Sequence, residues 1–428
     1  MMKRSLSLQL VALACALIVS VSALAAEQVT IVHMTHQWHG DGWHRYVKEV
    51  AEDFMREYPH IKVEVIIGAG HEYTDKFRVM TAAGTPPDIT DFATSVGNLA
   101  MEGLFLDLAP YLAREEAYIR EGILQNALEL YSLDDMLWGM PNSLFMVVSW
   151  YNEDLLDEAG LAYPADLPLS DWNWATLRDY ARKLTIDRDG DGQPEQWGLD
   201  RQSAAWEQFM ASNGGYPYDR RYNPTESRWN DVRIIDAIEF NRQLIQDDRV
   251  ASLDWDAATH FWTGRSGMAV VDGPGRLASL LDVTFRWDIA VQPAGPQGCH
   301  CGTVSADGFQ INAYTRHPDE AWEYVKYLTT RPESIEKFLA YTGRFPALTG
   351  VHEAYPRINP AAPKNWPAFV EAAAQPGAYF HPSVPEVDRI NDIVNTMLSQ
   401  IWRGETDPRT GMQQVHEQVQ AILDEQHR

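Results

Sequence analysis

The hydrophobic pattern near the start of the chain alternates between strand-like and helix-like segments. Residues 29–34 are rich in β-branched side chains and favour a strand. Apolar residues then recur every three or four positions over 43–58, which predicts an amphipathic helix that Pro59 ends. Residues 61–67 alternate apolar and polar positions, as a strand with one solvated face does.

These segments together have the length of one right-handed βαβ unit, so the two strands are expected to be parallel neighbours. Ligands of parallel sheets bind beyond the carboxyl ends of the strands. The loop Gln37-Trp38-His39 follows the first strand at that end. A binding crevice is therefore expected at this loop, where a large aromatic side chain has little core to enter.

Strands and helices continue to alternate along the rest of the chain, which predicts an α/β architecture. Further strands are expected within 84–92, 138–151, 267–272 and 309–313. The run over 138–151 is long enough to cross between two lobes, and the proline-rich segment 350–386 is expected to be irregular. Helices are expected at 73–83, 104–112, 119–130, 155–159, 174–184, 206–212, 232–247, 257–263, 319–329, 334–341, 388–402 and 411–426.

Residues 1–25 have the pattern of a cleaved secretory signal peptide. Two basic residues precede an apolar stretch over 10–21, and the sequence Ala23-Leu24-Ala25, with a small residue at each end, fits a cleavage site. A spanning helix is disfavoured because an acidic, polar chain follows at once. Lipidation at Cys15 is disfavoured because an alanine stands where a branched apolar residue is required. Export to the periplasm is expected.

The length of 428 residues corresponds to two or three domains. The chain carries 60 acidic and 35 basic residues, a formal net charge of −25, and signal cleavage would remove two of the basic residues. Such a surface repels phosphate backbones, so nucleic acid is not expected as a partner. We interpret the acidity as a contribution to solubility.

Two cysteines survive signal cleavage, Cys299 and Cys301, on either side of His300. In an oxidising compartment they could pair in a small ring, bind a soft metal together with His300, or stay free. The ring is favoured over the metal because only three ligands are local.

An acidic loop over 187–198 matches the start of an EF-hand calcium loop. Carboxylates stand at positions 1, 3 and 5 and a glycine at position 6, but Gly198 replaces the bidentate glutamate of position 12. A weak structural Ca²⁺ site and a metal-free Asx-turn hairpin both remain open, and no cofactor is required otherwise. The candidate ligands are Asp187, Asp189, Asp191, Gln193 and Glu195.

Two other classes of function receive little support from the motifs. The histidines His33, His36, His39 and His44 suggest metal transport, but no HExxH or CxxC spacing accompanies them. A secreted carbohydrate-active enzyme would need two carboxylates across a cleft, and the sequence marks no such pair and no GxSxG motif. An enzyme, and with it any catalytic residue, is therefore not expected.

Five segments along the chain carry patterns that belong together. They are 151–161 (YNEDLLDEAGL), 174–177 (WATL), 264–274 (GRSGMAVVDGP), 317–328 (HPDEAWEYVKYL) and 343–347 (GRFPA). In order and spacing they resemble the extracellular solute-binding protein family 1 of ABC importers, the maltose-binding-protein-like sugar binders. The resemblance covers nearly the whole chain.

The resemblance implies a two-lobed periplasmic-binding-protein fold, a flytrap with crossing hinge strands. One lobe would hold residues 27–141 and 306–355, and the other 142–305 and 356–428. Closure of the lobes on a ligand is then the mechanism. The ligand would be a sugar, either a monosaccharide, a short oligosaccharide or a sugar derivative, which a monomeric protein delivers to the transmembrane subunits of an ABC permease.

Sugar sites combine stacking aromatic rings with planar hydrogen-bonding side chains. The family positions that would line the cleft, with Arg344 added as a possible partner of an acidic sugar, are Gln37, Trp38, His39, Phe92, Thr94, Asn142, Trp206, Asp272, Arg276, Asp307 and Arg344. Trp206 shares a helix with Phe209 and is interpreted either as core or as a ligand platform.

One departure from the family concerns the size and charge of the ligand. Maltose-binding relatives carry Trp directly after the Gly-Pro pair, where this chain has Gly275 followed by Arg276. A stacking platform for long glucans is therefore in doubt, and Arg276 or Arg344 could pair with an acidic or phosphorylated sugar instead. Because a fold does not fix its ligand, a polyamine, peptide or metal chelate remains the alternative.

Overall fold

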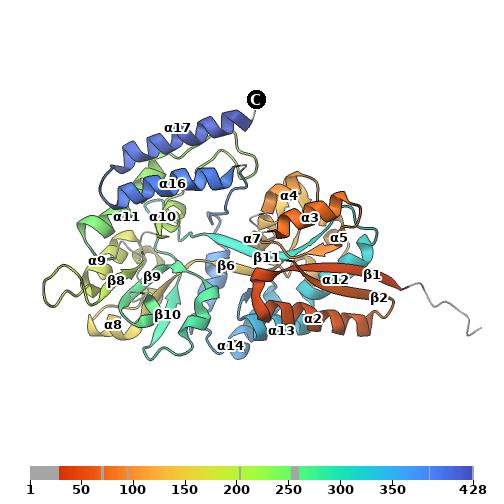
Figure 1. Cartoon of the computed structure of the whole chain (residues 1–428). Helices are drawn as coiled ribbons and strands as arrows, with labels where there is room; N and C mark the ends of the chain where they lie inside the picture. The colour runs from red at the N-terminus through yellow and green to blue at the C-terminus, as the bar shows by residue number, and fades with distance from the viewer. Residues whose placement is uncertain are drawn as a thin grey trace, which may run out of the picture.

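The computed structural model describes residues 28–68, 72–93, 96–201, 204–251, 260–384 and 386–426. They form two α/β lobes, with the strands β6 (Met140–Met146) and β11 (Val304–Ile311) running between them (Figure 1). The expected signal peptide and Thr94 lie outside the described residues. Within the described ranges, no helix combines the length and the apolar character needed to span a bilayer.

The first lobe is built on the predicted βαβ unit. β1 (Val29–His36) and β2 (Ile61–Gly68) pair in parallel along their whole length, which confirms the prediction. The connecting helix α2 (Gly40–Glu57) buries its periodic apolar face, as expected. The expected loop after β1 is instead a 3₁₀ turn, η1 (Gln37–His39), which leads directly into α2.

The sheet of the first lobe has the order β12-β6-β11-β3-β1-β2. β3 (Ile89–Thr90) is parallel to β1, whereas β11 is antiparallel to both of its neighbours, and β12 (Phe345–Pro346) closes the far edge. The other elements of this lobe are α3 (Tyr73–Ala82), α4 (Gly97–Met101), α5 (Ala109–Ala113), α6 (Ala117–Arg120), α7 (Gln125–Leu130), β4 (Ser132–Leu133), β5 (Met136–Leu137), α12 (Pro318–Thr330), α13 (Pro332–Thr342) and α14 (Tyr355–Ile358).

Two expected helices of the first lobe are wrong as continuous helices. Residues 104–108 are irregular apart from a β-bridge at Phe105, and the Leu106 N–H donates a hydrogen bond to the carbonyl of Ile311 at 2.8 Å. The expected helix at 119–130 is divided by a β-bridge at Ile123. In both cases pairing with a segment far away in the sequence overrides the local periodicity.

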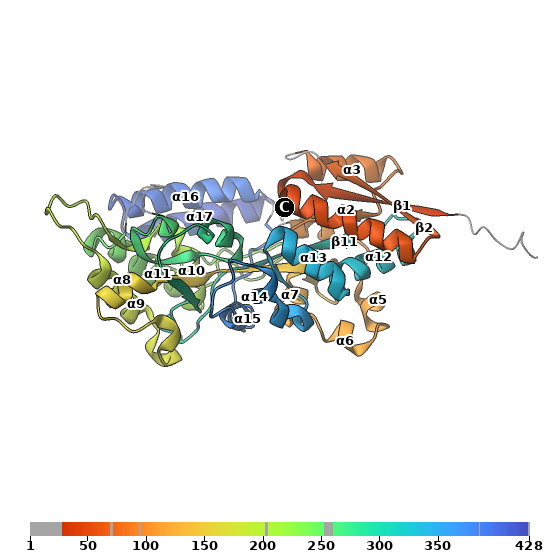
Figure 2. The same cartoon turned by 90° about the horizontal axis from the view of Figure 1, so that it is seen from below.

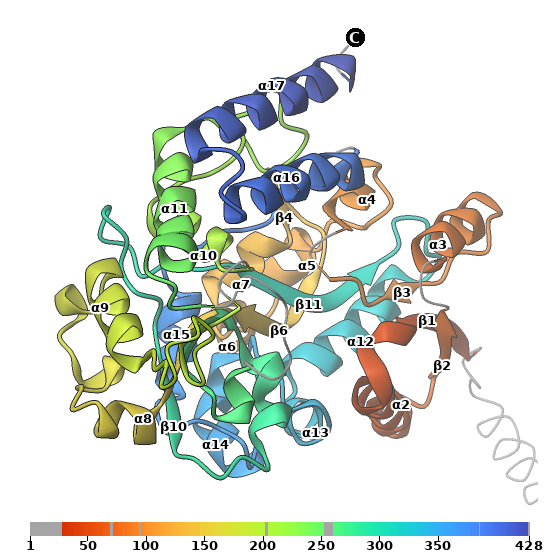
Figure 3. The ribbon, with the colours of Figure 1, turned by 60° about the vertical axis from the view of Figure 1, so that its left-hand side comes forward.

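The second lobe contains a four-stranded sheet with the order β10-β7-β9-β8. Helices α16 and α17 pack against one another, and α17 contacts α11 (Figure 3). The elements of this lobe are β7 (Val148–Asn152), α8 (Glu153–Glu158), α9 (Trp174–Leu184), β8 (Trp197–Asp200), α10 (Trp206–Ser212), α11 (Val232–Arg242) with a π turn at Gln243–Asp247, η8 (Phe261–Thr263), β9 (Ser266–Asp272), η9 (Pro274–Leu280), β10 (Trp287–Ala290), α16 (Val387–Trp402) and α17 (Pro408–Gln426).

The chain crosses between the lobes at three places. β6 runs into β7 with one residue between them, so the long β run of the sequence joins the two sheets as expected. β11 returns antiparallel to β6. In the third crossing, Asn359 donates to the carbonyl of Gly343 in the first lobe at 3.0 Å, whereas Lys364 pairs with Glu153 in the second. The third crossing therefore lies between residues 359 and 364.

The proline-rich segment 350–386 is more regular than expected. It contains part of the 3₁₀ helix η10 (Thr349–Ala354), helix α14, and α15 (Pro367–Ala373), which contacts β6 and β7; Figure 2 shows α14 and α15 between the lobes. In α14 and α15 a proline occupies the first or second helical position. Proline is well suited to a helix start because its missing N–H would have no partner there, so these prolines begin short helices.

Candidate ligand-binding cleft

Two cavities meet at the hinge strands. The larger, about 500 Å³, is lined mainly by the first lobe, and the smaller, about 350 Å³, by the second. Phe145 of β6 and Ser305 of β11 line both cavities, and we call these two residues the hinge floor. The two cavities therefore belong to one cleft. The residues that line the larger cavity form its first wall, those that line the smaller cavity form its second wall, and the hinge floor is common to both.

The first wall begins with the turn after β1, which carries His36, Trp38 and His39 into the larger cavity. The His36 ring accepts a hydrogen bond from the Trp38 N–H at 3.0 Å, which caps the turn. The Trp38 side chain is 64% exposed. A large aromatic residue at the lip of a cavity is suited to stacking on an apolar ligand face.

A buried carboxylate, Asp91, holds this turn in place. It accepts hydrogen bonds from the His36 N–H at 2.7 Å and from the indole N–H of Trp43 at 2.6 Å. Burial alone would raise the pKa of Asp91, but the nearby His39 and His33 and a hydrogen bond from Thr35 outweigh burial and lower it. The carboxylate is thus ionised and acts as the anchor of the first wall.

An ion pair completes the first wall. The Arg344 guanidinium donates to Asp307 at 2.8 Å and lies near the rings of Trp43 and Phe145, 5.3 and 5.5 Å from their centroids. The chain reaches this position because α13 ends at Gly343, whose φ of 65° is the left-handed helix cap that glycine favours. The first wall therefore presents a guanidinium and a carboxylate beside an aromatic ring.

The second wall is the turn that follows β9, residues 272–276. Gly273 lies so close to β6 that a Cβ there would be 2.5 Å from the Met146 carbonyl oxygen, so only glycine fits. Arg276 donates from Nε to Asp272 at 3.1 Å. This wall also presents a carboxylate and guanidinium pair to its cavity.

Behind the second wall lies a second, buried arginine. Arg201 follows β8, has a φ of 48°, and donates to Asp200 at 3.0 Å and to Asp272. Burial lowers the pKa of Arg201 and raises that of Asp200. One oxygen of Asp272 is therefore held by Arg201 while the other accepts from Arg276.

The family of the chain follows from comparison with known proteins. The family model of bacterial extracellular solute-binding proteins matches residues 40–333. The chain belongs to this family. Among curated solute-binding proteins, the chain is 20% identical over 393 residues to a galactooligosaccharide-binding protein of Bacillus subtilis, which covers 89% of this chain and 87% of that protein. It is 23% identical to a maltotriose-binding protein of Pyrococcus abyssi, over 88% and 76% of the two chains.

Solved structures of solute-binding proteins have the same fold. The sugar-binding protein MalE of Xanthomonas citri matches with a TM-score of 0.77 at 18% identity, over 93% of this chain and 98% of that one. An ABC substrate-binding protein of Listeria monocytogenes in complex with cycloalternan matches with a TM-score of 0.73 at 21% identity, over 93% and 99%. The predicted two-lobed α/β fold is confirmed.

Within this solute-binding protein, the two walls bring together seven of the residues singled out by the sequence. Trp38, His39, Phe92, Asp307 and Arg344 line the larger cavity. Asp272 and Arg276 line the smaller one. The sequence did not indicate Asp91 or the hinge floor, because no motif marks Asp91 and Phe145 lies in an apolar run typical of core.

Three other candidates line neither cavity. Gln37 is exposed in η1. Asn142 is buried and faces α2, where its side-chain oxygen accepts from the Tyr46 hydroxyl at 3.3 Å. Trp206 is half-buried against Trp229, with ring centroids 5.7 Å apart. The structure therefore does not bring these three residues together with the other seven, and their role in binding stays a prediction.

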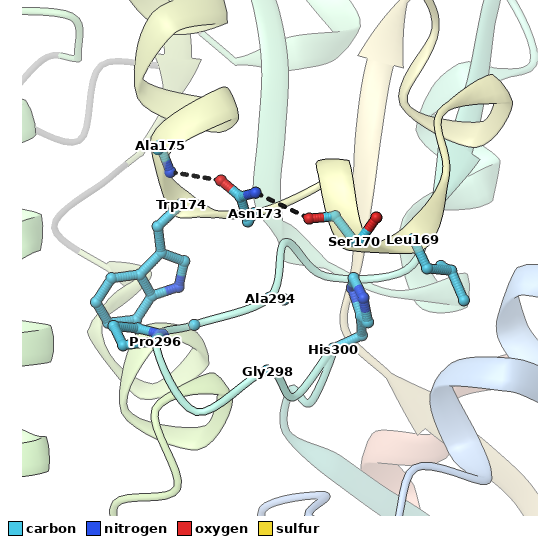
Figure 4. A pocket seen from close by; sticks show the side chains of 10 residues that line it. Leu169, Ser170, Asn173, Trp174, Ala175, Ala294, Pro296, Gly298 and His300 are labelled. Carbon is cyan, nitrogen blue, oxygen red and sulfur yellow. Dashed lines mark hydrogen bonds between the residues drawn. The ribbon is translucent and has the colours of Figure 1, made fainter.

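The largest of the three described hollows, about 800 Å³, lies in the second lobe at the start of α9 and holds none of the sugar-site candidates (Figure 4). Its polar side chains are already used by the protein. Asn173 caps α9 by accepting from the N–H groups of Ala175 and Thr176, and it donates to the Ser170 carbonyl at 3.0 Å. The hinge cleft is the better site despite its smaller cavities, because its polar groups converge from both lobes.

The remaining chemical motifs lie outside the cleft. Cys299 and Cys301 are joined as a disulfide in this structure, the pairing that the sequence favours. Among the described residues, the acidic trio Asp187, Asp189 and Asp191 is the one cluster with metal-like geometry, its oxygens lying within 4.8 Å of one another. The four histidines near β1 form no such cluster.

The acidic loop also has the hydrogen bonds of a turn. Asp187 accepts from the N–H groups of Gly190 and Gly192, and Glu195 accepts from the Arg188 N–H at 2.8 Å. The oxygen spacing of the trio fits a small cation, and the internal bonds fit the metal-free hairpin. The calcium site stays a prediction.

Proposed function

We propose that the protein is the substrate-binding component of an ABC importer. It binds a monosaccharide, a short oligosaccharide or a sugar derivative between its lobes and delivers it to the membrane permease. The first lobe comprises residues 27–141 and 306–355, and the second comprises 142–305 and 356–428. Contacts of the third crossing favour moving that last boundary to between 359 and 364.

The observation that carries the proposal is the construction of the cleft. Each wall offers a carboxylate and guanidinium pair, Asp307 with Arg344 and Asp272 with Arg276, and the aromatic floor residue Phe145 lies between the walls. Planar charged side chains form several hydrogen bonds with hydroxyl groups, while a ring covers the apolar C–H face of a sugar.

Lobe closure supplies the mechanism. Each cavity is lined by one lobe and the hinge floor, so a ligand on one wall gains the contacts of the other wall when the lobes close. A ligand that contacts both walls in one state shifts the population toward that state. Binding therefore needs no catalytic group, and the closed form is the one that a permease would recognise.

Location and partners follow from the same proposal. Residues 1–25 direct export to the periplasm, where the mature chain acts as a monomer. The names of the relatives, which include galactooligosaccharide-binding and maltotriose-binding proteins, support a sugar as ligand.

The test is a thermal-shift and calorimetric screen of the mature protein against neutral, acidic and sulfonated sugars, polyamines and peptides. A ligand that binds the native state raises the melting temperature by mass action. We expect one sugar class to bind, Phe145→Ala to weaken it about tenfold or more, and Phe285→Ala, a half-buried phenylalanine lining neither cavity, to leave it unchanged. Binding of polyamines or peptides alone would overturn the sugar assignment.

A further inference from the structure

We propose that the ligand carries an anionic group, and that Arg276 binds this group in the closed cleft. The inference rests on the proposed function and narrows it to acidic sugars. The shared chemistry is a carboxylate, sulfonate or phosphate attached to a sugar ring.

Arg276 has a binding capacity that the protein leaves unused. Its only hydrogen bond to the described residues runs from Nε to Asp272, so both terminal amino groups are available. The side chain is 47% exposed and lines the smaller cavity. A guanidinium with two free parallel donors is suited to bind an oxyanion in a bidentate manner.

Asp272, the carboxylate paired with Arg276, has a second cationic partner. Asp272 also accepts from Arg201, whose side chain is 3% exposed and cannot reach the cavity. The ring of Trp262 lies 5.2 Å from the Arg201 guanidinium and 5.5 Å from that of Arg276. Arg276 can therefore turn toward a ligand while Asp272 keeps a cationic partner.

The floor of the cleft places this arginine near the centre of the site. A Cβ at Gly275 would lie 3.5 Å from the ring of Phe145, and the Arg344 guanidinium lies 5.5 Å from the same ring. The two arginines therefore approach the floor from different lobes. At position 275 the second wall has no side chain, so it contributes charge there rather than an aromatic platform.

The carboxylates of the cleft do not cancel this preference. Asp91 is fully buried and accepts several hydrogen bonds, while Asp307 is paired with Arg344. The other carboxylate near Arg201 is Asp200, which is buried, lines neither cavity and accepts a hydrogen bond from Arg201. The exposed guanidinium of Arg276 is therefore available to an anion, although the chain as a whole is acidic.

The experiment compares matched sugars by titration calorimetry with the mature protein. The sets are glucose, glucuronate, glucose 6-phosphate and 6-sulfonated glucose, and galactose with galacturonate, together with one neutral and one acidic disaccharide. We expect an acidic member to bind at least about tenfold tighter than its neutral partner, with an affinity that falls as salt rises. The three acidic groups identify which oxyanion is preferred.

Variants separate charge recognition from folding. Arg276→Gln should lower the affinity for the acidic member at least about tenfold more than the affinity for its neutral partner. Arg265→Gln, an exposed arginine of the same lobe that lines neither cavity, is the matched control and should change neither. Equal melting temperatures of the variants without ligand would show that the folds are intact.

Two results would count against the inference in different ways. Equal or tighter binding of the neutral partner, or equal losses for both partners in Arg276→Gln, would overturn the acidic ligand and keep the sugar-binding function. Failure of every neutral and acidic sugar to bind would overturn the proposed function as well.

Discussion

The guanidinium of Arg344 donates to the carboxylate of Asp307 at 2.8 Å, and both side chains are mostly buried. The bond joins the turn after α13 to the hinge strand β11. It therefore couples the first wall of the cleft to the strand that carries the chain between the lobes.

Asp307→Asn tests this coupling because it keeps the shape of the side chain and removes the charge. Loss of a charge-assisted hydrogen bond costs about 1.5–3 kcal/mol, so we expect ligand affinity to fall by roughly tenfold to a hundredfold. Calorimetry measures the affinity. Asp319→Asn, which removes the exposed partner of Arg114 in the same lobe, is the control and should have no effect. Unchanged affinity in Asp307→Asn would remove this pair from the site.

Asp91 is expected to make stability depend on pH in the acid range. Its pKa is lower in the folded protein than in the unfolded chain, so its contribution is complete above the unfolded value, near 4, and is lost as the pH falls through the folded value. Asp91→Asn should destabilise the protein by about 2–4 kcal/mol at neutral pH.

Denaturant unfolding of both proteins between neutral pH and strong acid isolates the contribution of Asp91. The difference between wild type and Asp91→Asn should shrink as the pH falls below about 4. A difference that stays constant with pH would mean that Asp91 contributes by packing alone.

A segment of the second lobe, Arg221-Tyr222, contacts the first lobe. Arg221 donates to the carbonyls of Glu129 and Leu130 at the end of α7, at 3.0 and 2.9 Å, and the indole of Trp138 donates to the Tyr222 hydroxyl at 3.3 Å. A cation is favourable at a helix C-terminus, where carbonyl groups lack partners. Arg221→Ala should lower the free energy of unfolding by about 1–3 kcal/mol.

Arg221→Ala should also allow the two lobes to move more freely relative to one another. We expect small-angle scattering to show a wider distribution of sizes without ligand, because two bonds between the lobes are lost. Arg220→Ala, whose side chain bonds within its own loop, is the matched control. Unaltered scattering and stability in Arg221→Ala would show that the C-terminus of α7 needs no cap from the second lobe.

Calcium is expected to bind the loop at 187–195 weakly. Extracellular calcium modules have dissociation constants of about 10⁻⁴–10⁻³ M. Because the glutamate of position 12 is absent, we expect this loop to bind Ca²⁺ within that range or more weakly. Millimolar Ca²⁺ should raise the melting temperature of the wild type and not that of Asp189→Asn, with no change in sugar affinity. Equal melting curves with Ca²⁺ and with a chelator would show that the loop is a metal-free hairpin.

Local periodicity was sufficient to predict the βαβ unit, because β1, α2 and β2 are neighbours both in sequence and in space. It failed over 104–108, where the partner is Ile311, about two hundred residues later. Trp38 and His39 were predictable for the cleft because they follow a parallel strand. Such reasoning works where the structure depends on contacts between nearby residues.

The missing parts of the site depend on information that a single sequence does not carry. Phe145 is indistinguishable from core within its apolar strand, and only its place between the lobes makes it a floor. Arg201 has a left-handed backbone conformation that its residue type does not suggest. One signal was available: β8 and β9 are parallel and both end in aspartate, and Asp200 and Asp272 meet at Arg201.

The hinge floor lies between two charged pairs, one on each wall of the cleft. Asp307 and Arg276 stand on different lobes, and changes at distant sites usually add in their effects on stability. In the closed complex both contribute to one ligand, so their effects on affinity become interdependent. A double-mutant cycle of Asp307 and Arg276, measured on ligand affinity, therefore reports lobe closure as an interaction free energy, without any measurement of distance.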